Sequence, residues 1–287
     1  MSAIYRRELH SYFTSPIGWL LVAFLLVMNS FYFTAYNLNG GYSNYGLVLY
    51  NTLIVLLLFC PLLTMRSFSE ERRQKTDQLL LCAPVRTVEI VLATFFSAAT
   101  VLCVPAAVFC TCPLVLSLYG KVDMGMNYGS TLPWLLLACA CMAVGVFFSS
   151  VTENQIVAAL LSFAVLLLAY LMPGIASLVG SSAGAAFAVF AAVSALVGLL
   201  VWYMTRSRFL ALAVGLAGLA ALGVLYVFNS AAVTAALASV LGALALFAPF
   251  TGFVSGIFSL SAPVYYLSVI VLFLFLTVQS LERRRYN

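Results

Sequence analysis

Long apolar stretches separated by short polar ones run through the whole chain. Eight of these stretches reach about 20 residues, the length that a helix needs to cross the hydrocarbon core of a bilayer. They cover about 17–36, 46–65, 88–118, 131–150, 155–178, 185–204, 208–228 and 263–281. The pattern predicts an all-α integral membrane protein, a polytopic bundle of about eight transmembrane helices.

Two stretches depart from this regular pattern. The stretch 88–118 is overlong and contains Pro105 and Pro113, which predicts a kinked or tilted helix. The stretch 230–250 is rich in alanine, only weakly hydrophobic and followed by turn-forming residues. It could be a ninth span or a segment that does not cross the membrane.

The distribution of positive charge favours eight spans. Lysine and arginine accumulate in cytoplasmic loops of membrane proteins. With eight spans, 12 of the 13 lysines and arginines lie on one side, and only Lys121 lies on the other. A ninth span would move 283–285, three arginines, to the outer side. We therefore expect cytoplasmic termini and a re-entrant or interfacial segment at the outer face over 230–262.

The N-terminal residues predict a helix on the inner membrane surface over 1–15. In "AIYRRELHSYF" the apolar and aromatic residues recur at nearly helical spacing, and Arg6 and Arg7 fall off that face. Pro16 then turns the chain into the membrane. The apolar run that follows has no small-residue cleavage site, so we expect 17–36 to be a retained first span.

Composition makes lipid the solvent of this chain. The 287 residues are 64% hydrophobic and 7% charged, with a mean hydropathy of +1.12. A soluble domain has about a quarter of its residues charged. The net charge of +5 would favour a nucleic-acid partner in a soluble protein, but the membrane orientation accounts for it here. We expect the lipid bilayer, and no nucleic acid, as a partner.

Several chemistries find no support in the sequence. A P-loop needs a lysine after a glycine-rich turn, and neither Lys75 nor Lys121 has that context. Ion-coupled carriers usually place a carboxylate near the bilayer midplane, whereas all eight acidic residues here fall at span ends or in loops. We therefore expect no catalytic residues, no cofactor bound by this chain and no ATPase site of its own.

The seven cysteines leave two interpretations. Cys110 with Cys112, and Cys139 with Cys141, form C-x-C pairs that could bind a soft metal ion. They also fall inside apolar runs, where cysteine commonly packs as a small apolar residue. We favour packing and expect no metal site.

The stretch 66–86 concentrates charge in a chain that has little. Glu70 and Glu71 precede Arg73 and Lys75 at helical spacing, which predicts a short charged helix. Three leucines at 79–81 give it an apolar end, and a proline at 84 terminates it. Such a helix on the cytoplasmic side suits docking to a soluble partner; the alternative is a simple positive anchor.

The same stretch resembles a known family. "EERRQKTDQLLLCAPV" is similar to the E-E-R-R-x-G-T-L-E-x-L-L-x-x-P-V pattern of ABC-2-type transporter permeases, and most similar to the gliding-motility-type subfamily. Supporting stretches are "RRELHSYFTSPIGW", "SSVTENQIVAALLSF" and "VYYLSVIVLFLFLTVQSLERRR". Lys75 and Asp77 depart from the pattern, and the helix pair at 185–228 is additional to the usual six spans.

The resemblance implies an ABC-2 (type V exporter-like) permease fold, with 1–287 as a single permease domain in the bacterial inner membrane. It implies a separate ATPase dimer that uses ATP and Mg²⁺, and a second copy or a paralogous permease. The ATPase would dock on the cytoplasmic coupling loop 66–86, through Glu70, Glu71, Arg72, Arg73, Lys75, Thr76, Leu79, Leu80, Leu81 and Pro84.

A second contact of the ATPase would lie at Glu153, Asn154 and Gln155. The alternative for this turn is a helix cap at Thr152 with no partner. Two other functions also stay open, an ion-coupled secondary carrier and a non-transporting scaffold of a gliding or secretion machine. The sequence does not identify the substrate.

Overall fold

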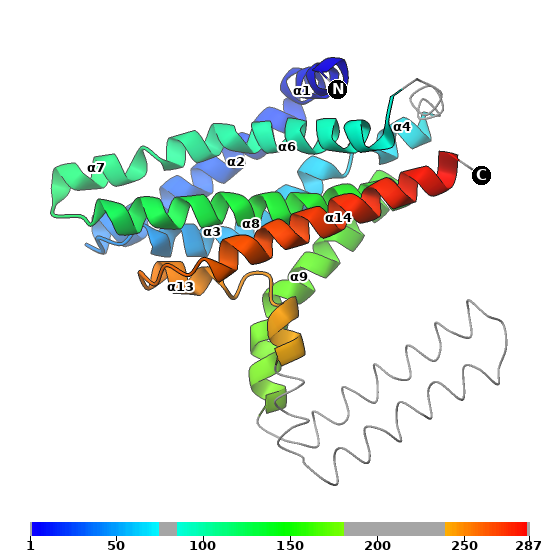
Figure 1. Ribbon diagram of the computed structural model, residues 1–287. Coiled ribbons are helices and arrows are strands. Elements are labelled where there is room, and N and C mark those ends of the chain that lie inside the picture. The colour runs from blue at the N-terminus through cyan, green and yellow to red at the C-terminus, as the bar shows by residue number, and fades with distance from the viewer. Residues whose placement is uncertain (1, 75–84, 181–238, 286–287) are drawn as a thin grey trace, which may run out of the picture. The chain divides into compact units, whose positions relative to one another are not determined.

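The computed structural model describes residues 2–74, 85–180 and 239–285 (Figure 1). The described chain divides into two compact units, residues 1–167 with 249–287 and residues 168–248. Its elements are α1 (Ser2–Thr14), α2 (Pro16–Tyr32), the π-helix η1 (Phe33–Asn39), α3 (Gly46–Thr64), α4 (Ser69–Arg73), α6 (Thr87–Phe109), α7 (Cys112–Tyr119), α8 (Met124–Val151), α9 (Gln155–Gly180), α13 (Phe250–Val254) and α14 (Ser261–Arg285).

Six helical segments in the described part are long and apolar enough to cross a membrane. They are Gly18–Asn39, Gly46–Arg73, Thr87–Tyr119, Met124–Val151, Gln155–Ser177 and Ser261–Arg284. These coincide with six of the eight predicted spans. The prediction of an all-helical, multi-pass fold is therefore confirmed for the described residues. The other two predicted spans, 185–204 and 208–228, lie outside the described residues.

Proline positions explain where two of these segments begin and bend. Pro16 occupies the first turn of α2, where its missing N–H removes no helical hydrogen bond. The overlong third segment breaks between α6 and α7, and Pro113 lies at the start of α7. The predicted kink in 88–118 is therefore confirmed, and it falls next to Pro113 rather than at Pro105, which lies inside α6.

α8 is the central helix of the larger unit (Figure 1). It packs against α3, α6, α13 and α14, and residues such as Trp134, Leu137 and Ala140 are fully buried. Gly145 permits the close approach of α3, because a Cβ there would lie 2.0 Å from Thr64 Oγ1. A side chain at position 145 would therefore require Thr64 or one of the two helices to shift.

Polar groups join the helices at the end of the unit opposite α4. Asn127 Oδ1 on α8 accepts a hydrogen bond from the Tyr45 N–H at 2.8 Å, and the Tyr45 hydroxyl donates to Asn29 Oδ1 at 3.0 Å. Asn44 Nδ2 donates to the Val254 carbonyl at the end of α13 at 2.7 Å. These bonds fix α2, α3, α8 and α13 to one another at this end.

The described part of 230–262 is helical over 239–244 and in α13. α13 has 5 residues, too few to cross a bilayer. Within the larger unit, Phe258 packs so closely on α8 that a Cβ at Gly129 would lie 2.0 Å from its ring. The placement of this segment at the outer membrane face stays a prediction.

Candidate functional site

The charged stretch after α3 begins with a short helix. α4 has Glu70 and Glu71 in its first turn and Arg72 and Arg73 in its last, the order that the helix dipole favours. The predicted charged helix is thus confirmed for Ser69–Arg73. The remaining predicted docking residues, Lys75, Thr76, Leu79, Leu80, Leu81 and Pro84, lie outside the described residues.

A serine of α8 caps the start of α4. Ser149 Oγ accepts hydrogen bonds from the N–H groups of Phe68 at 3.0 Å and Ser69 at 3.2 Å. Its own hydroxyl donates to the Met65 carbonyl at 3.1 Å. Ser149 is fully buried, so these bonds replace the water that an exposed helix end would bind. One side chain of α8 therefore holds both sides of the turn between α3 and α4.

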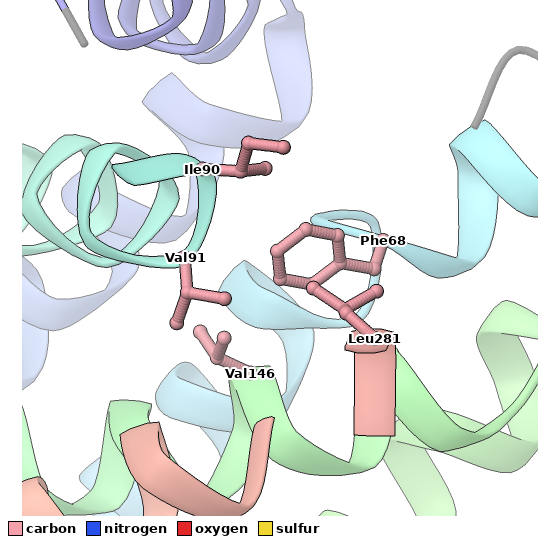
Figure 2. Packing of buried hydrophobic residues seen from close by; sticks show 5 residues of the cluster. All are labelled: Phe68, Ile90, Val91, Val146 and Leu281. Atoms are coloured by element: carbon pink, nitrogen blue, oxygen red, sulfur yellow. The ribbon is translucent and has the colours of Figure 1, made fainter. Parts of the chain in front are cut away.

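Apolar packing fixes the same turn. The Phe68 ring lies in a buried cluster with Ile90 and Val91 of α6, Val146 of α8 and Leu281 of α14 (Figure 2). Partly buried side chains from α1 and from the C-terminal half of α14 pack around this cluster. Because it gathers residues from three long helices, a displacement of the turn before α4 must disturb all three.

Ion pairs join the other side of α4 to α1 and to the turn after α3. Arg66 donates from Nε and Nη2 to the two carboxylate oxygens of Glu70, at 2.8 and 3.1 Å, and from Nη1 to Ser15 Oγ at 3.3 Å. The two hydrogen bonds to Glu70 are charge-assisted and bidentate. Arg7 of α1 donates to both Glu71 and Glu8.

Tyr12 adds a further link between α1 and α3. Its hydroxyl donates to the Leu63 carbonyl at 3.3 Å and is hydrogen-bonded to Ser67 Oγ at 3.1 Å. Burial raises the pKa of Tyr12 to about 12, so the hydroxyl keeps its proton at neutral pH. Tyr5 is bonded to Thr100 of α6 at 2.8 Å, which fixes the other half of α1.

The two arginines of α4 differ in exposure. Phe68 and Arg72 are four residues apart, joined by the bond from the Arg72 N–H to the Phe68 carbonyl at 3.1 Å, so they share one helical face. Arg72 is accordingly buried, whereas Arg73 is exposed. The sequence indicated only that both are charged. In the described part of α4, Arg73 is the arginine that a partner can reach.

The second predicted contact lies at the same end of α8. Glu153 and Asn154 are exposed and Gln155 is half-buried, in the turn that begins three residues after Ser149. The alternative for this turn, a cap of the next helix at Thr152, is wrong in its position. Thr152 ends α8, with its Oγ1 bonded to the Phe148 carbonyl at 3.1 Å, and Asn154 Oδ1 accepts from the Ile156 N–H at 3.0 Å to cap α9.

In the described membrane-length helices, the carboxylates lie near the helix ends. Glu89 lies in the first turn of α6, and Asp123 caps α8 by accepting from the Met126 N–H at 3.3 Å. Among these residues, no group of three or more histidines, cysteines and carboxylates is placed to hold a metal ion. The two cysteine pairs differ in exposure. Cys110 is exposed and Cys112 half-buried, whereas Cys139 is half-buried and Cys141 buried.

Comparison with known proteins identifies the family. Neither the curated proteins nor the solved structures contain a significant match. The family model described as "ABC-2 family transporter protein" matches residues 26–189, more than half of the chain, including α4 and its contacts on α8. With its six membrane-length helices, the chain belongs to the ABC-2 family of transporter proteins, whose members are membrane permease components.

Proposed function

We propose that this chain is the permease subunit of an ATP-driven exporter, powered by a separate ATPase dimer that binds ATP and Mg²⁺. The ATPase docks at the cytoplasmic end of the bundle, on the segment 66–86. A second copy of the chain, or a paralogous permease, completes the translocation path. The resemblance of the motifs supports a gliding-motility-type member in the bacterial inner membrane.

The anchoring of α4 is the observation that carries this proposal. Arg73 is exposed, whereas Phe68 and Ser149 fix the start of the same short helix to α6, α8 and α14. A force applied to the exposed part of α4 therefore reaches three membrane-length helices. A simple positive anchor would need only exposed charge and no such packing.

The docking surface that we propose uses the residues of α4 unequally. Arg73 makes polar contacts to the ATPase, together with Lys75 and Thr76 beyond it, and the leucines at 79–81 fill an apolar groove. Glu70 pairs with Arg66 at the end of α3, and Glu71 pairs with Arg7 of α1. Buried Arg72 supports the fold of α4. The turn 153–155 provides the second contact.

Purification with native partners tests the proposed function. We expect a P-loop ATPase to co-purify with the chain, and ATP hydrolysis to require that partner. The control is the chain purified alone in the same detergent, which should hydrolyse no ATP. Hydrolysis by the chain alone, or a native complex that contains no ATPase, would contradict the proposal.

Charge reversal at Arg73 tests the docking surface. Arg73→Glu is expected to weaken ATPase binding about tenfold or more, because it removes an attractive interfacial charge and adds a repulsive one. The loss should shrink as salt rises, since exposed charges are screened. Binding can be measured by titrating the ATPase onto the immobilised permease at two salt concentrations.

The matched control is Arg283→Glu, an exposed arginine on α14 at the same end of the molecule. This variant should bind the ATPase as the unmodified chain does. Equal losses in the two variants would show that the charge near α4 acts only as a membrane anchor.

Cysteine labelling tests the membrane orientation. In a cysteine-free background, Arg73→Cys should react with an impermeant maleimide only from the cytoplasmic side, and Lys121→Cys only from outside. Both positions are exposed, so lack of access within the fold will not mask them. Labelling of position 73 in intact cells would overturn the proposed orientation.

A further inference from the structure

A cavity of about 370 Å³ lies between α1 and the adjoining ends of α2, α3 and α4. Its volume is within the range of sites that hold small molecules. Its wall is of two kinds. Leu21 and Leu62 contribute apolar surface, and five residues contribute charge: Arg7, Glu8, Arg66, Glu70 and Glu71.

The cavity lies where the apolar segments give way to charge. The first membrane-length segment begins at Gly18, and Leu21 lies in its first helical turn. Leu62 is close to the end of the apolar run of α3, and Arg66 follows one helical turn later. The apolar wall therefore suits the acyl chains of an amphiphile, and the charged wall suits its head group.

The charged wall carries both signs. Two guanidinium groups, those of Arg7 and Arg66, oppose three carboxylates, those of Glu8, Glu70 and Glu71. The Glu8 side chain is 14% exposed and bonded to Arg7 at 2.7 Å, while the Arg7 side chain is 53% exposed and keeps further N–H donors for a ligand. A wall that carries both signs offers a partner to each charge of a zwitterion, whose phosphate can meet a guanidinium and whose cation can meet a carboxylate.

We propose that this cavity binds the head group of a phospholipid with a primary ammonium, of the phosphatidylethanolamine type. The ammonium donates hydrogen bonds to Glu8, a contact that the methylated ammonium of phosphatidylcholine cannot make. The phosphate accepts from Arg7, and the acyl chains leave along Leu21 and Leu62. The bound lipid then joins α1 to α4, independently of whether an ATPase docks there.

Native mass spectrometry of the full chain tests this proposal. The purified protein is given phosphatidylethanolamine, phosphatidylcholine or phosphatidylglycerol with identical acyl chains, and bound lipid is measured against lipid concentration. We expect one phosphatidylethanolamine molecule to bind about tenfold more tightly than the other two, the effect of one charge-assisted hydrogen bond. Soluble phosphoethanolamine, the free head group, should not displace it.

Two variants localise the binding. Glu8→Gln keeps the size of the side chain and removes its charge, so affinity for phosphatidylethanolamine should fall to that for phosphatidylcholine. Ser11→Phe fills the cavity from an exposed position of α1 and should abolish binding of that single lipid while the melting temperature stays unchanged. Glu282→Gln removes a carboxylate from α14, outside the cavity, and should change nothing.

Four results would overturn the proposal. They are equal binding of phosphatidylethanolamine and phosphatidylcholine, preference for phosphatidylglycerol, displacement by soluble phosphoethanolamine, and binding of phosphatidylethanolamine that is unchanged in both Glu8→Gln and Ser11→Phe. None of them depends on an ATPase, so failure here leaves the proposed transport function untouched.

Discussion

Replacing Ser149 by alanine is expected to lower the free energy of unfolding by at least about 2 kcal/mol. The change removes the single acceptor of the Phe68 and Ser69 N–H groups and the donor to the Met65 carbonyl. A buried polar group that loses its partner costs about 1–3 kcal/mol. Two N–H groups lose theirs together, because Ser149 is fully buried. Unfolding in mixed detergent micelles, followed by circular dichroism, measures the effect.

Ser150 is the matched control for this substitution. It is also fully buried and adjacent on α8, but its hydroxyl bonds only to the Phe147 carbonyl of its own helix, at 2.7 Å. Such bonds add little to helix stability, so Ser150→Ala should cost less than about 1 kcal/mol. Similar losses in the two variants would mean that Ser149 does not hold α4.

Ser149→Ala also distinguishes binding of the ATPase from transmission of its movement to the membrane helices. If Ser149 fixes α4 to α8, Ser149→Ala should leave binding of the proposed ATPase nearly unchanged, since Arg73 keeps its place at the surface. Transport per ATP hydrolysed should fall, because movement of α4 reaches α8 less directly. Arg73→Glu should do the reverse and weaken binding first. If Ser149→Ala and Arg73→Glu had the same effects on ATPase binding and on transport per ATP, these separate roles of the two residues would be contradicted.

The membrane-length helices were predictable because their signal is local. Length and hydropathy along the chain are sufficient to place six of them, and the break before Pro113 follows from the missing N–H of proline. Charge spacing likewise predicted the helix at 69–73. Each of these predictions depends on residues within a turn or two of one another.

The contacts that fix α4 were not predictable in the same way. In "FFSSV", Ser149 and Ser150 look alike, and only the packing of α8 against the turn after α3 distinguishes them. The pattern of α1 predicted a surface helix, but nothing in it indicated that Arg7 would meet Glu71. Such pairings depend on the tertiary arrangement of segments more than sixty residues apart.

The exposure of Arg72 could not be predicted from its charge. A dense charged stretch suggests that every member is exposed, and the docking surface was predicted to include both arginines. Helical spacing instead places Arg72 on the face of Phe68, which the bundle buries. Arg73, one position along, lies 100° round the helix and reaches solvent. The register of α4 therefore decides which arginine can meet a partner.

Phe68→Ala is expected to produce the largest loss of stability, about 3–5 kcal/mol. The Phe68 side chain is 3% exposed, and its ring touches buried residues of α6, α8 and α14. Truncation removes these contacts and leaves a cavity that three long helices cannot readily close. The control is Phe96→Ala on α6, where the side chain is 48% exposed and should contact lipid or detergent. That variant should lose less than about 1 kcal/mol.

A milder variant distinguishes packing from a specific role of the ring. Phe68→Leu keeps most of the apolar volume, so it should cost less than half as much as Phe68→Ala. If the cluster also transmits movement from α4, coupling should follow the same order, with Phe68→Leu between the unmodified chain and Phe68→Ala. ATPase binding should stay constant across the series. Equal stability of Phe68→Ala and Phe96→Ala would show that the cluster does not anchor α4. Movement of α4 could then not reach α6, α8 and α14 through Phe68.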